Sequence, residues 1–489
     1  MNCQKTKLIR DKFSMATLIS STSLSSLFLS ALLLLLLLCL SSKPHVVEAK
    51  KTEETFPQTH TLEVASLLAS DVCNRSPKVS NQDSSLQVVH NYGPCNPRNQ
   101  GKGAHVPSHG KMLLQDKLRA KAIQAKAKGS KSSSPTAPVQ SGTGLGIGTG
   151  MYAVTMGLGT PAQEQTLLLD ATNDLSWIQC EPCSTSCHQK LPRFNPAKSS
   201  SYKNVSCSSA TCKSINGLGQ TSCSGTTCHY EYQLSSKSLS GVLATDTLSF
   251  TKPDTIPNFI FGCGQKNEGP FARASGVLSL SRSSLSLTSQ IAGKYENRFS
   301  HCLPSSSSSV GHLTFGGKIP KTAKFTPIKN DTRSSVYPVD MTGVSVGGRL
   351  VPIDESFFED AGCIVDPGTL ISHLPPAVYS TMARAFEDLM TDYPRTDGYE
   401  DFQTCYDFTG YDSVKIPSIS FHFNGGLELA VDKSGIMIAL PSLKKVCLAF
   451  ASNFEDGNEA IFGGSQLRTY DVIYDLAEGR IGFAPGGCS

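Results

Sequence analysis

Two short stretches of the chain decide how it folds: LLLDATNDLSWIQC (Leu167–Cys180) and CIVDPGTLISHLP (Cys363–Pro375). In each of them a run of apolar residues ends in an aspartate, Asp170 or Asp366, and residues that favour turns follow. This order is typical of a buried strand that leads into a loop. We therefore expect each carboxylate to lie on a loop directly after a strand.

The surroundings of the two aspartates repeat along the chain. The apolar stretch GVLSLS follows Asp170, with Ser279 109 residues later, and AIFGG follows Asp366, with Gly463 97 residues later. Two similar halves that each contribute one carboxylate predict two lobes with a cleft between them.

The body of the chain, from residue 151 onward, is expected to be mainly β. Short apolar runs recur about every 8–15 residues and are separated by Gly, Pro, Ser and Asn, a pattern typical of many short strands joined by turns. The clearest predicted helix is Ala377–Met390, which two prolines introduce. We expect an N-terminal lobe over residues 151–331 and a C-terminal lobe over residues 332–489.

The first 150 residues differ from this body. Residues 1–49 predict a secretory signal peptide, because basic residues precede an apolar run, Leu27–Leu40, and small residues follow near Ala49. A membrane anchor is the alternative, but the run is shorter than the roughly 20 residues that cross a bilayer. Residues 50–150 predict a propeptide that ends in a flexible linker over 129–150, where we expect processing.

Charge is unevenly distributed. Residues 1–150 contain 18 Lys and Arg against 8 Asp and Glu, whereas the remainder contains 26 against 32. An acidic body does not favour nucleic-acid binding. Lys111–Lys128 is rich in Ala, Leu, Lys and Gln and predicts a basic helix in a region without strand alternation. The favoured interpretation is a propeptide helix that covers an acidic cleft, and the alternative is a DNA-binding segment.

Thirteen of the 17 cysteines follow residue 151, and in an exported chain they predict a disulfide framework. The odd number leaves one cysteine over, and Cys363 is the best candidate for it. The predicted disulfide cysteines are Cys180, Cys183, Cys187, Cys207, Cys212, Cys223, Cys228, Cys263, Cys302, Cys405, Cys447 and Cys488.

The spacing of Cys180, Cys183 and Cys187 also imitates a metal-ligand run, but an exported chain favours disulfides there. We therefore expect no metal and no cofactor. Asn204 and Asn330 begin triplets that can accept N-linked glycans, which fits export.

The two aspartate loops resemble the active-site loops of pepsin-type (A1) aspartic proteases, most of all the plant nepenthesin-like group, which includes relatives of the chloroplast nucleoid DNA-binding protein. YAVTMGLGTP (152–161), DLSWIQCEPC (174–183), HLTFGG (312–317) and the terminal RIGFAPGGC extend the resemblance over nearly all of the body. LQVVHNYGPC (86–95) resembles a family propeptide more weakly. The resemblance implies a mainly β, two-lobed pepsin-like acid protease fold with an interlobe cleft.

The resemblance also implies a chemistry for Asp170 and Asp366. Two like charges in contact cannot both ionise, so the pair shares one proton. The ionised carboxylate takes a proton from a water that attacks the peptide bond, and the other protonates or hydrogen-bonds the carbonyl oxygen. A polypeptide substrate in the cleft of a monomer is therefore expected.

Residues beside the aspartates depart from the family pattern. Ala171 and Pro367 replace hydroxyl residues that join the two loops across the lobes, and each lost hydrogen bond removes about 0.5–1.5 kcal/mol. Thr172 replaces a glycine that lets backbone lie against the carboxylates. These changes predict a loosened pair of catalytic loops.

Other positions are expected to support the site in altered form. The side chain of Asn173 can donate to the first aspartate, and Thr369 is retained beside the second. Leu234 stands where the family has the flap tyrosine, and Tyr232 lies on the same strand face as a partial substitute. Ser279 replaces a family glycine behind the first loop.

Two functions of different classes follow. The leading hypothesis is an aspartic endopeptidase that is made as a zymogen and secreted to the extracellular space or cell wall, with vacuole and plastid as alternatives. The other is a pepsin-fold protein that has lost turnover and acts as a binding or inhibitor protein.

Overall fold

The computed structural model describes residues 57–68, 70–74, 84–99, 107–127, 151–183, 193–215, 220–234, 237–251, 253–267, 274–330, 335–359, 362–440, 444–454 and 457–488. The expected signal peptide (1–49) and the linker (129–150) lie outside these residues, as does the expected lobe boundary at 331/332. Most of the described residues that form regular structure are in strands, as the sequence pattern predicts.

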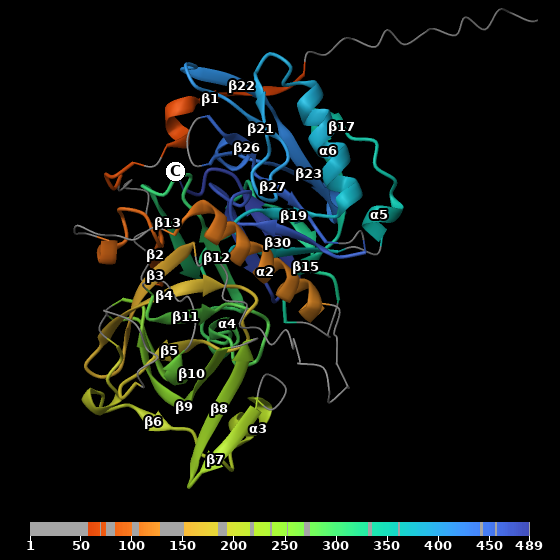
Figure 1. The fold of residues 1–489 in the computed structure, drawn as a ribbon. Helices are drawn as coiled ribbons and strands as arrows, with labels where there is room; N and C mark the ends of the chain where they lie inside the picture. Colours follow the sequence, from red (N-terminus) through yellow and green to blue (C-terminus); the bar gives the residue numbers. More distant parts are fainter. Residues whose placement is uncertain are drawn as a thin grey trace, which may run out of the picture. The chain divides into compact units, whose positions relative to one another are not determined.

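The largest sheet runs in the order β14, β30, β29, β12, β13, β2, β3, β4, β11, β5, β10, β9, β8, β7, with β6 paired to β9 (Figure 1). Its strands are β2 (Ser85–His90), β3 (Tyr152–Leu158), β4 (Gln163–Asp170), β5 (Trp177–Gln179), β6 (Lys203–Asn204), β7 (Gln220–Ser224), β8 (Thr227–Leu234), β9 (Lys237–Ser249), β10 (Thr255–Asn267), β11 (Gly276–Ser279), β12 (Arg298–Cys302), β13 (Val310–Phe315), β14 (Lys324–Pro327), β29 (Asp471–Asp475) and β30 (Arg480–Ala484).

Smaller sheets make up the second half of the fold. They contain β15 (Pro338–Val339), β18 (Cys363–Asp366), β28 (Ala460–Gly463), β19 (Ser372–Leu374) and β27 (Phe450–Ser452); β17 (Arg349–Leu350), β16 (Met341–Val346), β23 (Ile419–Phe423) and β24 (Leu427–Ala430); β20 (Arg395–Thr396), β21 (Cys405–Tyr406), β26 (Val446–Leu448) and β25 (Met437–Ala439); and β1 (Thr59–Glu63) with β22 (Ser413–Pro417).

Among the described residues, α-helices are few and mostly short. They are α2 (His109–Ala127), α3 (Ala210–Ser214), α4 (Leu287–Gln290), α5 (Ser356–Glu359) and α6 (Pro376–Asp388). The predicted helix at 377–390 is thus confirmed as α6, which places a proline in its first turn, where the missing N–H costs nothing. The predicted basic helix at 111–128 is confirmed as α2.

The internal repeat predicted from the sequence is confirmed by strand pairing. Strand β4 ends at Asp170 and lies parallel to β11, with Ser279 opposite Asp170. Strand β18 ends at Asp366 and lies parallel to β28, with Gly463 opposite Asp366. The same local arrangement therefore carries both aspartates.

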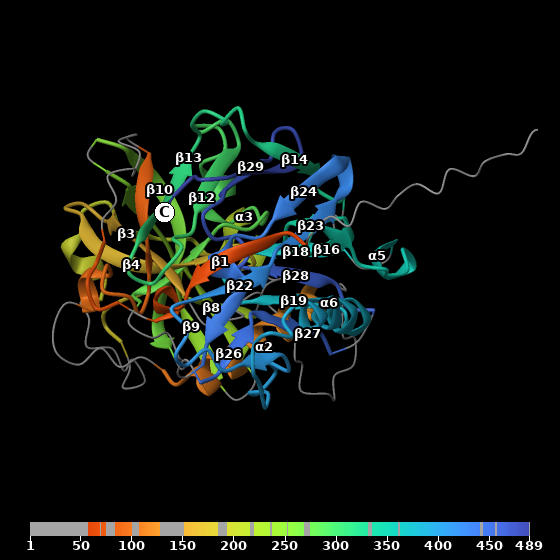
Figure 2. The ribbon, with the colours of Figure 1, turned by 90° about the horizontal axis from the view of Figure 1, so that it is seen from above.

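The two halves share hydrogen bonds near the C-terminus. Strand β29 pairs with β12 (Figure 2), and β30 pairs with β14. The last strands of the chain therefore belong to the large sheet rather than to the smaller ones. The main apolar core also includes buried side chains of both halves, such as Phe261 and Phe421. This continuity holds the two aspartate-bearing strands in a fixed relation.

The absence of strand alternation before residue 128 is a misleading signal, because two strands lie there. β2 runs between β13 and β3, with Leu86 and Val88 on its buried face, and β1 pairs with β22. Their backbone partners come from distant parts of the chain, so a local pattern carries little information about them.

Disulfides add covalent links within the fold. The described residues contain the pairs Cys73–Cys95, Cys180–Cys263, Cys207–Cys223, Cys212–Cys228, Cys302–Cys488 and Cys405–Cys447. Cys183 is disulfide-bonded as well, and Cys187 lies outside the described residues. Cys363 is a free thiol, fully buried, and burial raises its pKa far above the usual range, so it is inert.

Candidate active site

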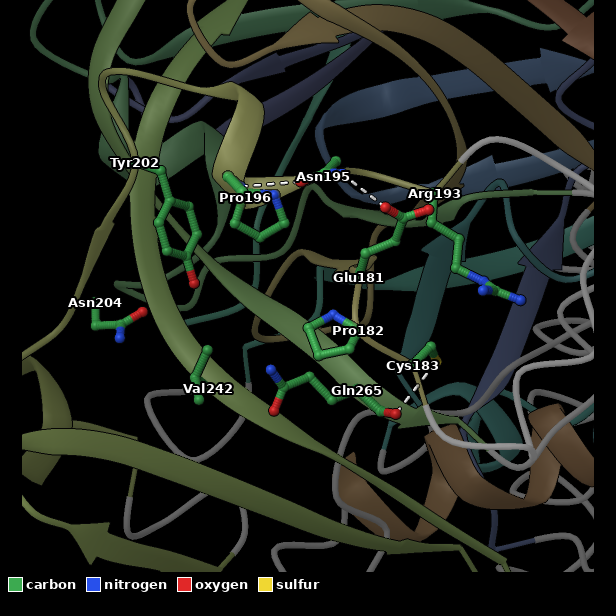
Figure 3. A pocket seen from close by; sticks show the side chains of 11 residues that line it. Glu181, Pro182, Cys183, Arg193, Asn195, Pro196, Tyr202, Asn204, Val242 and Gln265 are labelled. Atoms are coloured by element: carbon green, nitrogen blue, oxygen red, sulfur yellow. Dashed lines mark hydrogen bonds between the residues drawn. The ribbon is translucent and has the colours of Figure 1, made fainter.

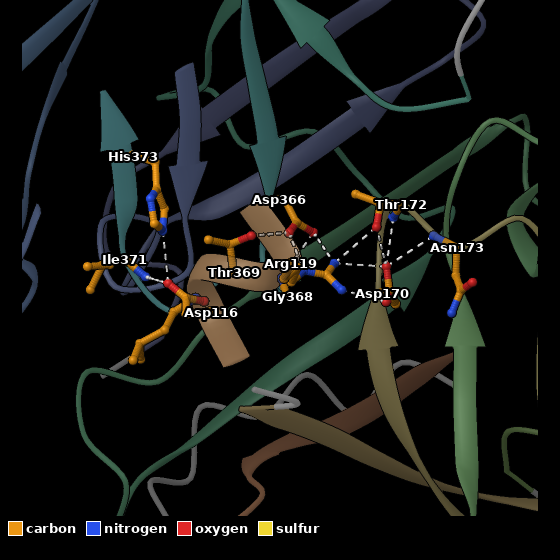
Figure 4. A network of polar contacts seen from close by, with 11 residues as sticks. Asp116, Arg119, Asp170, Thr172, Asn173, Asp366, Gly368, Thr369, Ile371 and His373 are labelled. Carbon is orange, nitrogen blue, oxygen red and sulfur yellow. Dashed lines mark hydrogen bonds and ion pairs between the residues drawn. The ribbon is translucent and has the colours of Figure 1, made fainter. Parts of the chain in front are cut away.

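Asp170 and Asp366 stand at the ends of the equivalent strands β4 and β18 and face one another across a single buried site (Figure 4). Asp170 is 4% exposed and Asp366 is fully buried. Burying two carboxylates is costly unless hydrogen bonds and an opposite charge compensate them. The groups that do so define the site.

Asp170 is held by the turn that follows it. Its Oδ1 accepts from the backbone N–H groups of Thr172 (2.8 Å) and Asn173 (3.0 Å), and from the hydroxyl of Thr172 (2.8 Å). The expected donation from the Asn173 side chain is not formed: its amide nitrogen is buried without a hydrogen-bond partner among the described residues. Thr172, which seemed only to replace a glycine, is the residue whose side chain supports this aspartate.

Asp366 is held in a similar manner. The hydroxyl of Thr369 donates to its Oδ2 (2.6 Å), and the N–H of Gly368 donates to its Oδ1 (3.2 Å). Each aspartate therefore has one threonine hydroxyl and at least one backbone N–H. The chain supports its two carboxylates symmetrically although the residues of its two loops differ.

Two further hydrogen bonds attach the first aspartate loop to strand β11. Ser279, on β11, donates its hydroxyl to the carbonyl of Asn173, and its N–H donates to the Ser176 hydroxyl (2.9 Å). Ala171 is buried and has no hydroxyl to offer. The serine that departs from the family pattern thus anchors the loop to the strand behind it.

Arg119, from the middle of α2, lies between the two aspartates. Its Nη1 and Nη2 donate to Asp170 at 2.8 and 2.9 Å, and its Nε and Nη2 both donate to Asp366 at 2.9 Å. The guanidinium is a planar fork that matches carboxylates on two sides at once. It is 2% exposed, so α2 closes the site completely.

Burial and the neighbouring charges shift the pKa values of Asp170 and Arg119. Burial alone would raise the pKa of Asp170, but the Arg119 cation and the hydrogen bonds from Thr172 outweigh it and hold that pKa below the usual aspartate value. Burial works to lower the pKa of Arg119, and the two aspartates raise it well above its usual value. With α2 in place, Asp170 is therefore ionised and shares no proton with its neighbour.

Further contacts hold α2 on both sides of the pair. Lys126 donates to the carbonyl of Thr172 (2.6 Å) and to Asp174 (2.8 Å), in the first half of the fold. Asp116 accepts from the N–H of Leu370 (2.6 Å) and pairs with His373 (3.1 Å), in the second half. The helix bridges the two halves, and Figure 1 shows it crossing between them.

Apolar contacts complete the seat of α2. Its small buried residues Ala120, Ile123 and Ala127 form a cluster with Val336, Ile364 and Ile461. The same helix carries its cations Arg119 and Lys126 inward, so these two are not available to a DNA backbone.

The sequence gives only a partial signal for Arg119. A basic helix before an acidic body predicts that the helix covers the cleft, but it does not single out one of several cations. Asp116, one turn earlier, is the lone acidic residue of α2, and its burial is visible only in the structure.

The remaining predicted residues lie elsewhere or cannot be placed. Tyr232 and Leu234 belong to β8, but their side chains lie outside the described part of the chain. Asn204 and Asn330 are exposed at the surface, where a glycan would be accommodated. Among the described residues, no cluster of His, Cys, Asp or Glu is arranged to hold a metal ion.

A separate pocket of about 680 Å³ lies in the first half of the fold (Figure 3). Glu181, Arg193, Asn195 and Tyr202 are among its lining residues, and Asn195 donates to Glu181 at 2.7 Å. Neither aspartate lines it, so it is not the site of the carboxylate pair. Within the described residues, no helix combines the length and apolar character that a bilayer crossing requires.

Comparison with known proteins agrees with this geometry. Residues 152–317 match the family described as Xylanase inhibitor N-terminal, and residues 336–485 match Xylanase inhibitor C-terminal. An aspartyl protease family protein of Arabidopsis thaliana is 41% identical over 467 residues, which cover 93% of this chain and 98% of that protein. Aspartic proteinase nepenthesin-2 of Nepenthes gracilis is 32% identical over 352 residues, covering 69% and 78%.

Solved structures share the fold. The crystal structure of edgp superposes with a TM-score of 0.56 at 20% identity, covering 68% of this chain and 91% of that one. Basic 7S globulin from soybean gives 0.55 at 20% identity, covering 68% and 92%. At this identity the likeness concerns the fold alone.

Proposed function

The chain belongs to the plant aspartyl protease family, and from this premise we propose that it is an aspartic endopeptidase that its own helix α2 keeps inactive. The observation that carries the proposal is the Arg119 guanidinium, which reaches both carboxylates within 2.9 Å. Both carboxylates therefore point into one small site, as a pair that shares a proton requires.

The reaction uses only these carboxylates and water. With α2 withdrawn, one ionised carboxylate removes a proton from a bound water, whose oxygen adds to the carbonyl carbon of the peptide bond. The other carboxyl donates its proton to the carbonyl oxygen. The tetrahedral intermediate then collapses. The carboxyl that took the proton from water gives it to the amide nitrogen, the other carboxylate takes back the hydroxyl proton of the intermediate, and the C–N bond breaks. The hydroxyls of Thr172 and Thr369 orient Asp170 and Asp366 during these steps.

Inhibition by α2 has two physical parts. The guanidinium of Arg119 fills the space between the carboxylates that the attacking water needs. It also stabilises the ionised form of Asp170, which then has no proton to share with Asp366. A peptide cannot bind there while α2 stays in place.

We further propose that the protein is exported and processed within residues 129–150, and that it acts as a monomer on polypeptides. The many disulfides support an oxidising compartment. Secretion to the extracellular space or cell wall fits best, and Asn204 and Asn330 would carry glycans there.

The test is cleavage of a denatured protein substrate by the full chain after it has been cut within the linker. We expect pepstatin-sensitive cleavage between about pH 3 and 6, and Asp366→Asn abolishes it because the pair loses one of its carboxylates. Uncut chain should be inactive, and Arg119→Ala should make it partly active without cutting. Absence of any cleavage by the cut parent would reject the proposal.

A second function is favoured by one specific observation: both halves match families named after xylanase inhibitors. On this proposal the protein binds a glycoside hydrolase and performs no turnover. Binding would then be indifferent to Asp366→Asn, and the cut chain would cleave nothing. A pull-down that loses its partner on Asp366→Asn would contradict it.

A further inference from the structure

One contact of α2 has the features of a binding site for a carboxylate rather than of simple packing. Asp116 Oδ1 accepts from the N–H of Leu370 at 2.6 Å, and its Oδ2 accepts from the N–H of Ile371 at 3.4 Å and lies 3.1 Å from Nε2 of His373. We call these three donors, the two N–H groups and the imidazole, the carboxylate cradle.

The carboxylate cradle and the side chain that occupies it are buried. Asp116 is 1% exposed and His373 is 3% exposed. Within the described residues, the N–H groups of Leu370 and Ile371 make no other hydrogen bond. When α2 leaves, these donors lose their acceptor and face the opened cleft. The open enzyme therefore presents three convergent donors that favour an anion.

The cradle lies beside the reacting carboxylates. Leu370 directly follows Thr369, which holds Asp366, and Asp116 precedes Arg119 by three residues on one face of α2 (Figure 4). Three helical residues advance about 4.5 Å, whereas an extended peptide advances about 3.3 Å per residue. A side chain in the cradle thus belongs to a residue one or two positions from the peptide bond under attack.

We propose that the carboxylate cradle is a specificity site of the protease, and that α2 imitates a substrate by placing Asp116 in it. The substrates it selects are peptides with Asp or Glu one or two residues from the scissile bond. This inference rests on the proposed function, since only a protease has such substrates. The role of His373 is to position substrate, not to react.

The test compares two peptides of otherwise identical sequence. One carries Glu and the other carries Gln at a single position, which lies one or two residues from the cleaved bond. The full chain, cut within residues 129–150, is assayed at about pH 5, where a Glu side chain is largely ionised. Docking of α2 at this pH lowers both kcat/KM values by the same factor and leaves their ratio unchanged. We expect kcat/KM to be about tenfold higher for the Glu peptide, because charge-assisted hydrogen bonds reward the anion. The gain should appear in KM rather than in kcat.

Variants connect the preference to the cradle. His373→Leu should bring the Glu/Gln ratio close to one, and His373→Gln, which keeps a donor, should retain part of it. His422→Gln is the matched control, because that histidine pairs with Ser345 on a different sheet and should leave the ratio unchanged. Equal kcat/KM values in the parent, or a ratio that survives His373→Leu, would overturn the inference.

Failure of the proposed function gives a different result. If neither peptide is cleaved, there is no protease, and fluorescence anisotropy then measures binding of the same two peptides to the cut chain. About tenfold tighter binding of the Glu peptide, lost in His373→Leu, would still support the cradle. Equal affinities would overturn it.

Discussion

Among single residues, Thr172 supports the first aspartate loop in a way that the family pattern does not indicate. A threonine in place of the family glycine suggests loss of support, yet its hydroxyl donates to Asp170 Oδ1 just as that of Thr369 donates to Asp366. The side chain also accepts from Arg119 (3.1 Å). The loop has therefore moved its supporting hydroxyl by one position rather than lost it.

Thr172→Val tests this, because valine keeps the shape of threonine and removes the hydroxyl. A hydrogen bond to a charged acceptor contributes about 1.5–3 kcal/mol, so we expect kcat/KM of the cut chain to fall at least tenfold. Thr172→Ser should restore most of it, whereas Thr172→Gly, the family residue, should not. Thr155→Val, which removes a hydroxyl partner of Thr166 away from the aspartates, is the control in the same peptide assay. Full activity of Thr172→Val would show that the hydroxyl has no role.

At the scale of the element, strand β2 is part of the sheet although it precedes the linker. It pairs with β13 on one side and β3 on the other, and its alternate residues Leu86 and Val88 are buried while Gln87 is exposed. Leu86→Ala should therefore lower the free energy of unfolding of the uncut chain by about 2–5 kcal/mol in urea titration, through lost burial and a residual cavity. Gln87→Ala should change it by no more than about 0.5 kcal/mol. Equal effects of the two variants would mean that β2 does not belong to the sheet.

Some strands could be predicted from the sequence, and others could not. The aspartate-bearing strands β4 and β18 and their partners β11 and β28 follow from a repeat of apolar runs, because each run is buried on both faces and its composition reflects that. β1 and β2 were missed because their partners are not neighbours in sequence: Val89 pairs with Ala153, and Thr59 pairs with Pro417. Arg119 was missed for a related reason: its meaning depends on two carboxylates that only the tertiary fold brings together.

At the scale of the whole molecule, the segment before the linker is attached to both halves by different means. β1 pairs with β22, β2 lies inside the large sheet, and α2 binds through a buried cation. Backbone pairing does not depend on pH in this range, whereas the ion pairs of α2 do. Cutting the linker and acidifying should therefore have separate effects.

The ionisation of Asp170 determines how docking of α2 depends on pH. Its pKa is lowered while α2 is docked, so docking is stabilised at pH values above the ordinary aspartate pKa of about 3.9, and that stabilisation disappears as the pH falls through the lowered value. After the linker is cut, we expect the two pieces to co-elute in size-exclusion chromatography at pH 7, since β1, β2 and α2 all remain in place. Hydrogen exchange, corrected for its intrinsic pH dependence, should stay slow in both α2 and β2 at pH 6. Below about pH 4 it should become fast in α2 while β2 stays protected. Pieces that separate at pH 7, or an α2 that exchanges equally fast at pH 6 and pH 3, would contradict an acid-released helix held to the body by its strands.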